Sequence, residues 1–409
     1  MKKHLLFANL LAALLIVGMT ACETDETKDF TGYINNQVTP ENPEDPETPE
    51  DPETPSQDSI LVAGSDTIYI VYSGATASVT NDTHGYVSVS GANVTVNALE
   101  ADTTMLIVLS GSTDNGSLLV YRKKPFTLRL DGVSITNPNG PAINNQCGKA
   151  LYLEAVENTE NTLTDGSTYA EAPLNASGEA IDQKGALFSE GQIFFCGTGT
   201  LTVNGNAKNG IASDDYIVFE SGIVKVNVDD TGSNGVKVND GLTISGGSLT
   251  INVKADGARG IKSDAYTAIS GGTTTITTSG DCKIETVDGV KDTTSCAGIK
   301  CDSLFTMSAG TLTIKSSGDG GKGINSAQNV EFSGGTLSVI TTGDNEVGKP
   351  KGVKSDTGII VSGGTFYVKV EKSWACDNGT SSETPGDHLT IVGSPTTKSI
   401  AKKLVNIKY

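Results

Sequence analysis

The chain has 409 residues, a formal net charge of −19 and only 5% aromatic residues. This acidic balance argues against a nucleic-acid partner, which would need a basic face. The charge is also unevenly distributed, because residues 23–58 hold 12 acidic side chains against one lysine, which leaves a net charge of −10 on residues 59–409. An acidic surface of this kind repels other polyanions unless cations intervene.

Residues 1–21 are expected to be an export signal and not part of the fold. Two lysines precede an apolar run from Leu5 to Val17, which is too short to span a membrane. The four residues ending in Cys22, MTAC, resemble a bacterial lipobox, in which Cys22 becomes the lipidated first residue. An ordinary cleaved signal with an incidental cysteine is the alternative. The acidic residues that follow resemble a Bacteroidetes surface-export signal, which predicts an outer-membrane lipoprotein exposed at the cell surface.

Residues 22–58 form a predicted acidic, proline-rich stalk. Within it, residues 39–58 read TPENPEDPETPEDPETPSQD. Proline favours the extended polyproline II conformation and the carboxylates repel one another, so this segment is expected to stay stretched and solvated. It would hold the domain that follows, residues 59–409, away from a membrane.

From residue 59 the chain is strand-like, and six ungapped copies of one pattern lie between residues 210 and 368. Each copy begins with Gly followed by Ile or Val, and Gly recurs twelve places later. In five of the copies, two pairs of apolar residues lie on either side of that second Gly, and one residue separates the members of each pair. This spacing is the period of two of a half-buried strand. The copies begin at Gly210, Gly235, Gly260, Gly298, Gly323 and Gly352.

A period of about 25 residues with three short strands predicts an all-β solenoid, a single-stranded parallel β-helix. In this fold each inward residue lies over its equivalent in the next coil, about 4.8 Å away. A β-propeller blade is rejected because it needs four strands and roughly 40 residues. The register places Ile314 in the core and Thr313 on the surface.

Three stretches of the chain resemble a bacterial carbohydrate-binding β-helix family described from a cellulolytic clostridium. They are LRLDGVSITNPNGPAINN, NTLTDGSTY and GTGTLTVNGNAKNGIASDD. The resemblance covers roughly residues 60–370. It implies a right-handed β-helix, bound calcium, and affinity for plant polysaccharides, acidic pectin-like chains especially, in a family not itself established as catalytic.

Two rows of charged residues are expected on the outer side of the first strand of each coil. The lysines, two places after the repeat glycine, are Lys237, Lys262, Lys300 and Lys354. The acids, four places after it, are Asp214, Asp264, Asp302 and Asp356, with Asn239 in a fifth copy. As a binding site, the lysine row would hold uronate carboxylates while the Asp oxygens hold calcium. The alternative is a solvated sheet face on which opposite charges flank one another.

A second acidic set lies in the loops before the repeats, where calcium would find carboxylate and carbonyl oxygens. Its members are Asp256, Asp281, Asp288 and Asp319. Asp-Gly is also a common turn signal, so each residue alone is ambiguous. Cys282 and Cys296 bracket an insertion, Gly280 to Ala297, and are candidates for a disulfide. Trp374 is a candidate for stacking on a sugar, with packing at the end of the core as the alternative.

The sequence therefore predicts a surface lipoprotein that binds an acidic plant or host polysaccharide with the help of calcium, without cleaving it. Two other classes stay open. A calcium-dependent pectate-type lyase would use Lys262 or Lys300 as the base, although a lysine that recurs in every coil is poor evidence for one catalytic base. An adhesin or structural surface protein would bind no glycan.

Overall fold

The computed structural model describes residues 66–287, 290–294 and 296–409. The chain divides into two compact units, and all the described residues lie in the second, Pro55–Tyr409. The predicted export signal, the lipid anchor at Cys22, the stalk at 22–58 and the candidate ligand Asp288 lie outside the described residues. Within the described part, no helix is long and apolar enough to cross a membrane.

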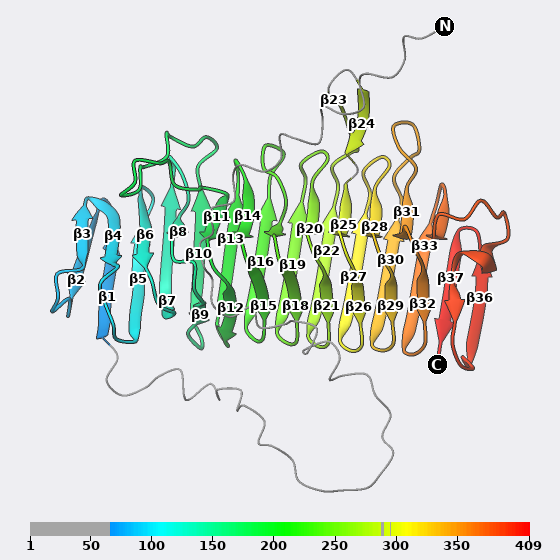
Figure 1. The fold of residues 1–409 in the computed structure, drawn as a ribbon, viewed down its shortest axis with the longest axis horizontal. Helices are drawn as coiled ribbons and strands as arrows, with labels where there is room; N and C mark the ends of the chain where they lie inside the picture. The colour runs from blue at the N-terminus through cyan, green and yellow to red at the C-terminus, as the bar shows by residue number, and fades with distance from the viewer. Residues whose placement is uncertain (1–65, 288–289, 295) are drawn as a thin grey trace, which may run out of the picture. The chain divides into compact units, whose positions relative to one another are not determined.

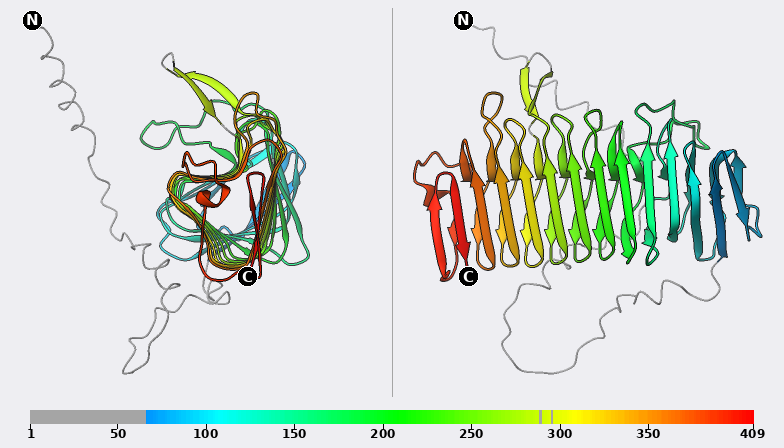
Figure 2. Two further views of the ribbon diagram at one scale, coloured as in Figure 1. Left: turned by 90° about the vertical axis from the view of Figure 1, so that its right-hand side faces the viewer. Right: turned by 180° about the vertical axis from the view of Figure 1, so that it is seen from behind.

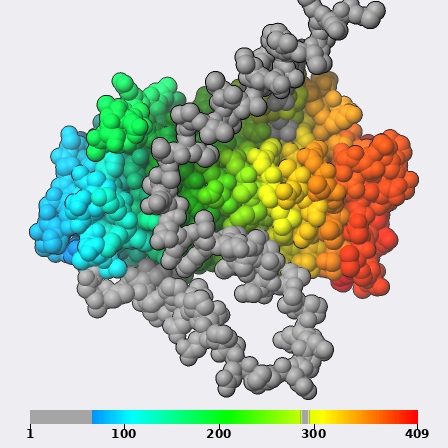
Figure 3. All heavy atoms as spheres, in the orientation of Figure 1, coloured from blue at the N-terminus to red at the C-terminus, as the bar shows by residue number. Residues whose placement is uncertain are grey.

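The described unit is a β-solenoid of about 11 turns with roughly 25 residues per coil, which confirms the fold predicted from the repeat. Each regular coil contributes three strands, and each strand pairs in parallel with its equivalent in the next coil (Figure 1). The three ladders are called faces 1, 2 and 3 below, and the left view of Figure 2 looks along the stack. Figure 3 shows the coils following one another in chain order across the surface.

The strands of each face are as follows. Face 1 contains β4 (Ala92–Ala98), β6 (Gly116–Arg122), β8 (Ile143–Asn145), β11 (Gly185–Ser189), β14 (Asn209–Ser213), β17 (Val236–Val238), β20 (Arg259–Ser263), β25 (Ala297–Cys301), β28 (Lys322–Ser326), β31 (Lys351–Ser355) and β34 (Trp374–Asp377). Face 2 contains β9 (Leu151–Ala155), β12 (Ile193–Gly197), β15 (Tyr216–Phe219), β18 (Gly241–Ile244), β21 (Thr267–Ile269), β26 (Phe305–Met307), β29 (Val330–Phe332), β32 (Ile359–Val361) and β35 (Thr390–Ile391). Face 3 contains β1 (Asp66–Ser73), β5 (Met105–Thr113), β7 (Phe126–Asn137), β10 (Glu160–Asp165), β13 (Thr200–Gly205), β16 (Ile223–Val228), β19 (Ser248–Val253), β22 (Thr273–Thr278), β27 (Thr311–Ser316), β30 (Thr336–Thr341) and β33 (Thr365–Val370).

Antiparallel strands close both ends of the stack, which the repeat did not predict. At the start, β2 (Thr76–Thr80) pairs with β1 and β3 (Val87–Ser90) pairs with β4. At the end, β37 (Leu404–Lys408) pairs with both β33 and β36 (Thr397–Ala401), after a short 3-10 helix, η2 (Pro385–His388). The insertion between β22 and β25 forms an antiparallel hairpin of β23 (Lys283–Val287) and β24 (Val290–Thr294), which projects from the coils (Figures 1 and 2).

The inward columns follow the predicted register. On face 3, Ile314 lies between Ile276 and Val339 of the neighbouring coils, and all three side chains are fully buried. Thr313, the preceding residue, is half-buried on the outer side of the same strand. A single coil would leave such aliphatic side chains in water, whereas stacking buries each of them, which stabilises the fold by about 1.5–3 kcal/mol per side chain.

Two glycines in each copy answer to different constraints. At Gly298, where a copy begins on face 1, an added Cβ would overlap the inward side chain of Ile314 and the carbonyl oxygen of Gly323. Gly310 forms the turn between faces 2 and 3 with a φ of +78°, a left-handed conformation that residues with a Cβ rarely adopt. The first position forbids a side chain, and the second requires positive φ.

The six cysteines of the described domain are buried and unpaired. Cys301 takes an inward place on face 1, with its Sγ 3.4 Å from the Oγ of Ser326, as expected of a small core residue. The thiols of Cys282 and Cys296 meet at the base of the hairpin, where a hydrogen bond from Cys296 lowers the pKa of the Cys282 thiol to about 6. Their joining in a disulfide stays a prediction, which peptide mapping of protein purified without reductant would test.

Replacing Ile314 by Asp should unfold the domain, because a carboxylate would enter a column of aliphatic side chains without a partner. We expect a loss of more than about 4 kcal/mol in the free energy of unfolding for I314D and less than about 1 kcal/mol for the control T313D. Urea unfolding followed by circular dichroism measures both. Similar losses at the two positions would contradict the register.

Candidate functional site

The predicted lysine row lies on the outer side of face 1. Strand pairing places Lys237, Lys262 and Lys300 at equivalent positions of β17, β20 and β25, and Lys354 occupies the same place on β31. The four side chains are only 15% to 29% exposed. Their ammonium groups contact carboxylates of the same face, so the two predicted rows lie against each other.

Each ammonium group contacts the acidic row of its own coil or of the next. The Nζ of Lys262 lies 2.5 Å from Oδ1 of Asp264 and 2.5 Å from Oδ2 of Asp302. Lys237 hydrogen-bonds to Oδ1 of Asn239 at 2.8 Å and pairs with Asp264 of the next coil. The remaining pairs are Lys300 with Asp302 and Lys354 with Asp356. An anionic ligand on this face would have to share the ammonium groups with the protein's own carboxylates.

These contacts also set the protonation of the acidic row. Burial alone would raise the pKa of Asp302, but hydrogen bonds from Lys262 and Lys300 outweigh it and hold the pKa below its ordinary value. Lys237 and Lys262 act on Asp264 in the same way, and its pKa is also lowered. Both carboxyl groups therefore remain ionised at a pH where an ordinary Asp is already protonated.

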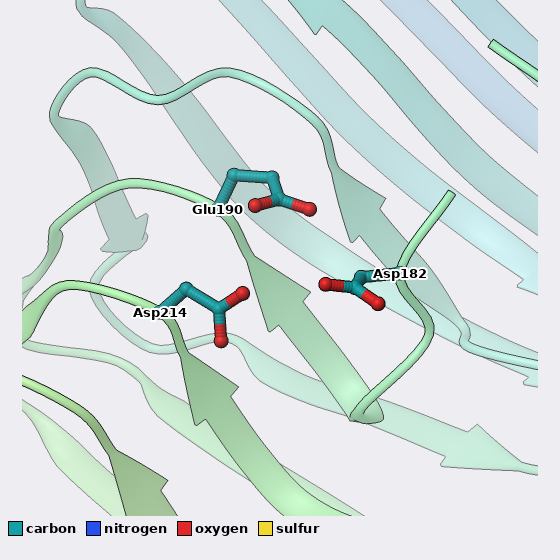
Figure 4. Close-up of side chains that lie close together, drawn as sticks. All are labelled: Asp182, Glu190 and Asp214. Atoms are coloured by element: carbon teal, nitrogen blue, oxygen red, sulfur yellow. The ribbon is translucent and has the colours of Figure 1, made fainter. Parts of the chain in front are cut away.

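The network ends in a cluster of three carboxylates, Asp182, Glu190 and Asp214 (Figure 4). One oxygen from each lies within 4.8 Å of the others. Asp214 is linked to the rest of its row through Asn239, whose Nδ2 donates a hydrogen bond of 3.3 Å to its Oδ1. Lys184 contacts Asp182 at 2.7 Å and also Asp214. Three carboxylates thus surround one ammonium group, whereas along the row lysine and Asp residues alternate.

Three separate segments supply the cluster. Asp182 comes from the long connection between β10 and β11, Glu190 follows β11, and Asp214 follows β14. The backbone carbonyl of Asp182 accepts hydrogen bonds from the side chains of Asn144 at 3.0 Å and Gln146 at 3.2 Å, which hold this connection against the outer side of face 1. Figure 4 shows the three carboxylates turned toward the same space.

The electrostatics of the cluster favour a cation. Burial, and then the negative charges of Asp214 and Asp182, raise the pKa of Glu190, while Lys184 acts in the opposite direction. Carboxylate oxygens that converge in this way are the hard ligands that calcium takes, in numbers of six to eight. The three side chains supply part of such a shell, and the rest would have to come from backbone carbonyls, water or a ligand.

Sequence reasoning found Asp214 and missed Asp182 and Glu190. Both missed residues precede Gly210, where the regular copies begin, so no repeat position pointed to them. The available signal was the opposite of a repeat, namely a group of charged residues around Lys184 that breaks the period.

An open hollow of about 570 Å³ adjoins the cluster and shares Asp182 with it. The hydroxyl of Tyr169 donates a hydrogen bond of 2.8 Å to Asp165 at its floor. Lys208 lies 4.9 Å from the centre of the Tyr169 ring and donates a hydrogen bond of 2.6 Å to the carbonyl of Gln183. The hollow therefore offers an aromatic ring, a cation and carboxylates side by side.

The predicted loop acids form a row of their own at the corner between faces 3 and 1. Oδ1 of Asp256 accepts the backbone N–H of Asp281 at 2.8 Å, and Oδ1 of Asp281 accepts that of Asp319 at 2.8 Å. Asp319 accepts the N–H of Asp344 at 2.9 Å in the same way. One oxygen of each of these three carboxylates is thus engaged in joining successive coils, and the structure does not bring this row to the three-carboxylate cluster.

Trp374 lies on β34, so it still belongs to the stack, where the repeat had placed it beyond the last coil. Its ring centre is 4.2 Å from that of His388, and the Nζ of Lys402 lies 4.4 Å from it. These contacts pack Trp374 against the C-terminal end of the solenoid. A sugar would have to stack beside these neighbours or displace one of them.

Comparisons with known proteins give one consistent direction. A family model described as "Carbohydrate-binding domain-containing protein" matches residues 90–346. A curated protein of the same description from Acetivibrio thermocellus is 30% identical over 149 residues, which are 36% of this chain and 50% of that protein, so the match spans half of its length. A solved structure, the polysaccharide lyase-like protein from C. thermocellum as a gadolinium derivative, has a TM-score of 0.52 and 26% identity and covers 67% of this chain and 100% of that one.

The opposite pKa shifts predict opposite effects of two neutral substitutions, measured as melting temperature in chelator. Glu190→Gln should raise it at pH 7 by about 1–2 °C, because a carboxyl whose folded pKa is raised destabilises the fold once ionised. The gain should vanish as the pH falls toward the ordinary Glu pKa of about 4.3.

The matched control is Asp302→Asn, since the pKa of Asp302 is lowered. It should reduce the melting temperature at pH 7 by a similar amount, and the difference should fade as the pH falls from about 3.9 through the folded pKa. A lower melting temperature for Glu190→Gln at pH 7 would show that Glu190 stabilises the cluster through Lys184.

Proposed function

The chain belongs to the family of carbohydrate-binding domain-containing proteins, and from this premise we propose that it binds a polysaccharide on its solenoid surface without cleaving it. The observation that carries the proposal is the family match to residues 90–346, which cover all three faces of the stack and include the carboxylate cluster. A solenoid suits an extended ligand, because equivalent side chains recur at every coil along its length.

We propose further that the polysaccharide is acidic and that calcium joins it to the protein. The domain has a net charge of −10, and the lysines of face 1 are already paired with Asp residues. Local positive charge for a polyuronate must then come from a bound cation. The cluster of Asp182, Glu190 and Asp214 is our first choice, because its carboxylates outnumber the ammonium group of Lys184. A cation there would displace Lys184, and glycan carboxylates would add ligands to it.

A relative supports a hard cation in general terms. The solved neighbour is named as a gadolinium derivative, and gadolinium, like calcium, prefers oxygen ligands. Asp264, Asp302 and Asp356 of the outer row remain further candidates, as do Asp256, Asp281 and Asp319 of the corner row. In each of them a cation would have to replace a lysine or share an oxygen that already accepts a backbone hydrogen bond.

We also propose that the protein is a lipoprotein anchored at Cys22 in the outer membrane and exposed at the cell surface. The basis is the sequence before residue 59, with its short apolar run, its lipobox and its acidic, proline-rich stalk. Residues 39–58, extended as polyproline II, would span about 60 Å. That reach would present the solenoid to a long insoluble chain well outside the membrane.

A lyase is the second candidate, because the solved neighbour is named as polysaccharide lyase-like. The most suitable base by position is Lys184, which breaks the repeat and lies in the carboxylate cluster. Burial alone would lower its pKa, but hydrogen bonds to Asp182 and Asp214 outweigh burial and raise it. A general base must be unprotonated to act, so this environment favours binding over catalysis.

Chelation should abolish binding of short oligogalacturonates, which we expect to be measurable by calorimetry in excess calcium. It should also lower the melting temperature, since an ion that binds only the folded state at 100 times its dissociation constant stabilises by about 2.7 kcal/mol. Asp182→Asn with Asp214→Asn should reproduce both effects. Replacing Lys262 and Lys300 by Gln should weaken glycan binding but leave calcium affinity nearly unchanged.

Two outcomes would contradict these proposals. Undiminished binding of the acidic glycan in chelator would remove calcium from the mechanism. New ultraviolet absorbance from pectate in the presence of calcium, caused by unsaturated uronides, would establish the lyase instead. Asp356→Asn is the matched control for the calcium arm, because Asp356 lies on the same face, away from the cluster.

A further inference from the structure

A row of aromatic side chains runs along the outer side of face 2. Tyr152 of β9 pairs in register with Phe194 of β12, and their ring centres are 5.1 Å apart with planes inclined by 24°. Tyr216 of β15 follows on the next coil, with its ring centre 5.6 Å from that of Phe194 and the planes inclined by 88°. Strand alternation sends the neighbours of these residues, such as Leu153 and Phe195, into the core and leaves all three rings half-exposed.

A fourth ring extends the row. Gly241 is the register partner of Tyr216 on the following coil, and it carries no side chain. The ring of Tyr266, from the coil after that, lies across Gly241 so closely that an added Cβ would overlap it. We call Tyr152, Phe194, Tyr216 and Tyr266 the aromatic row. It spans the coils of β9 to β21, in a chain with only 5% aromatic residues.

Polar groups border the aromatic row where the strands of face 2 begin. The side-chain amide of Gln192 donates a hydrogen bond to Asp215, and Asp215 in turn accepts the backbone N–H of Tyr216 at 2.8 Å. Burial raises the pKa of Asp215. This side of the row therefore presents a partly desolvated carboxylate next to exposed ring surface.

Acidic groups also border the opposite side. Glu154 accepts a hydrogen bond of 2.9 Å from Arg129, which occupies that guanidinium group. Glu220 lies close enough to Tyr152 that its charge adds to burial in raising the pKa of that phenol. With Asp215, the rim has three carboxylates, and the arginine beside it is already paired. Such a rim repels a polyuronate and can accept hydrogen bonds from hydroxyl groups.

We propose that the aromatic row is a binding surface for a neutral polysaccharide, whose pyranose rings stack by their apolar C–H faces on Tyr152, Phe194 and Tyr216. Rings on neighbouring coils are 5.1 and 5.6 Å apart, close to the advance of one sugar unit in an extended chain. Stacking removes aromatic and C–H surface from water, and the hydroxyl groups at the sugar edge meet the carboxylate rim. The surface needs no cation, because its ligand has no charge to neutralise.

This inference rests on the proposed polysaccharide binding but adds a second surface with a different ligand class. The competing explanation is that cross-strand aromatic pairs only stabilise the sheet, since such pairs contribute about 0.2–1 kcal/mol each. The two differ in what a ring deletion does to binding at unchanged fold, which the following experiment measures.

The test is calorimetry of the full chain with neutral β-linked gluco-, xylo- and manno-hexasaccharides, all in chelator so that cation-dependent binding is silent. The wild-type protein should bind at least one of them, and Phe194→Ala should weaken that binding by about tenfold or more. Phe194→Tyr keeps the ring and should bind nearly as the wild type does. Tyr367→Ala, an outward tyrosine of face 3, is the matched control and should bind unchanged.

If Phe194→Ala fails to fold, Phe194→Leu takes its place, because it keeps an apolar outward side chain without a ring. Wild-type-like binding by a folded Phe194 variant that lacks the ring would overturn the proposal. So would the absence of any neutral binding by the wild type while oligogalacturonate binds with calcium, which would leave the proposed function intact. Absence of both activities would remove the proposed function as well.

Discussion

The stacking of one coil on the next is the constraint on which the rest of this structure depends. Parallel pairing at a spacing of about 4.8 Å places each side chain directly over its equivalent, so a residue type suited to one coil must be suited to contact with itself. Inward columns such as Ile276, Ile314 and Val339 satisfy this easily, because aliphatic groups pack well on one another. Outward rows of charge do not, and the lysine row is accompanied by an acidic row for that reason.

Repetition made much of the fold predictable. The alternation around each second glycine fixed which residues point inward, and the structure buries them on the expected faces. Spacing also predicted that Lys262 and Asp264 share the outer side of one strand. It gave no side-chain conformation, so the reach of Lys262 to Asp302 of the next coil appeared only in the structure.

What the sequence did not reveal lies where the period fails. Asp182 and Glu190 come from coils with a long connection and irregular corners, and Tyr152 and Phe194 precede the first clear copy. The antiparallel end strands have no repeat position at all. A binding surface on a solenoid needs something that differs from the coils around it, so a method that looks for regularity finds the scaffold and passes over such places.

The antiparallel ends carry a consequence for how these molecules behave at high concentration. A solenoid cut off after a regular coil would expose a full set of parallel hydrogen-bonding groups, matched in register to the opposite end of another copy, and could grow head to tail into a fibre. Here β37 runs against β33, and β2 runs against β1, so the last ladders point the wrong way for a further parallel coil to join them. The same periodicity that builds a long polysaccharide-binding surface would polymerise without these reversed strands, and they keep the ligand, not a second protein molecule, as the partner of that length.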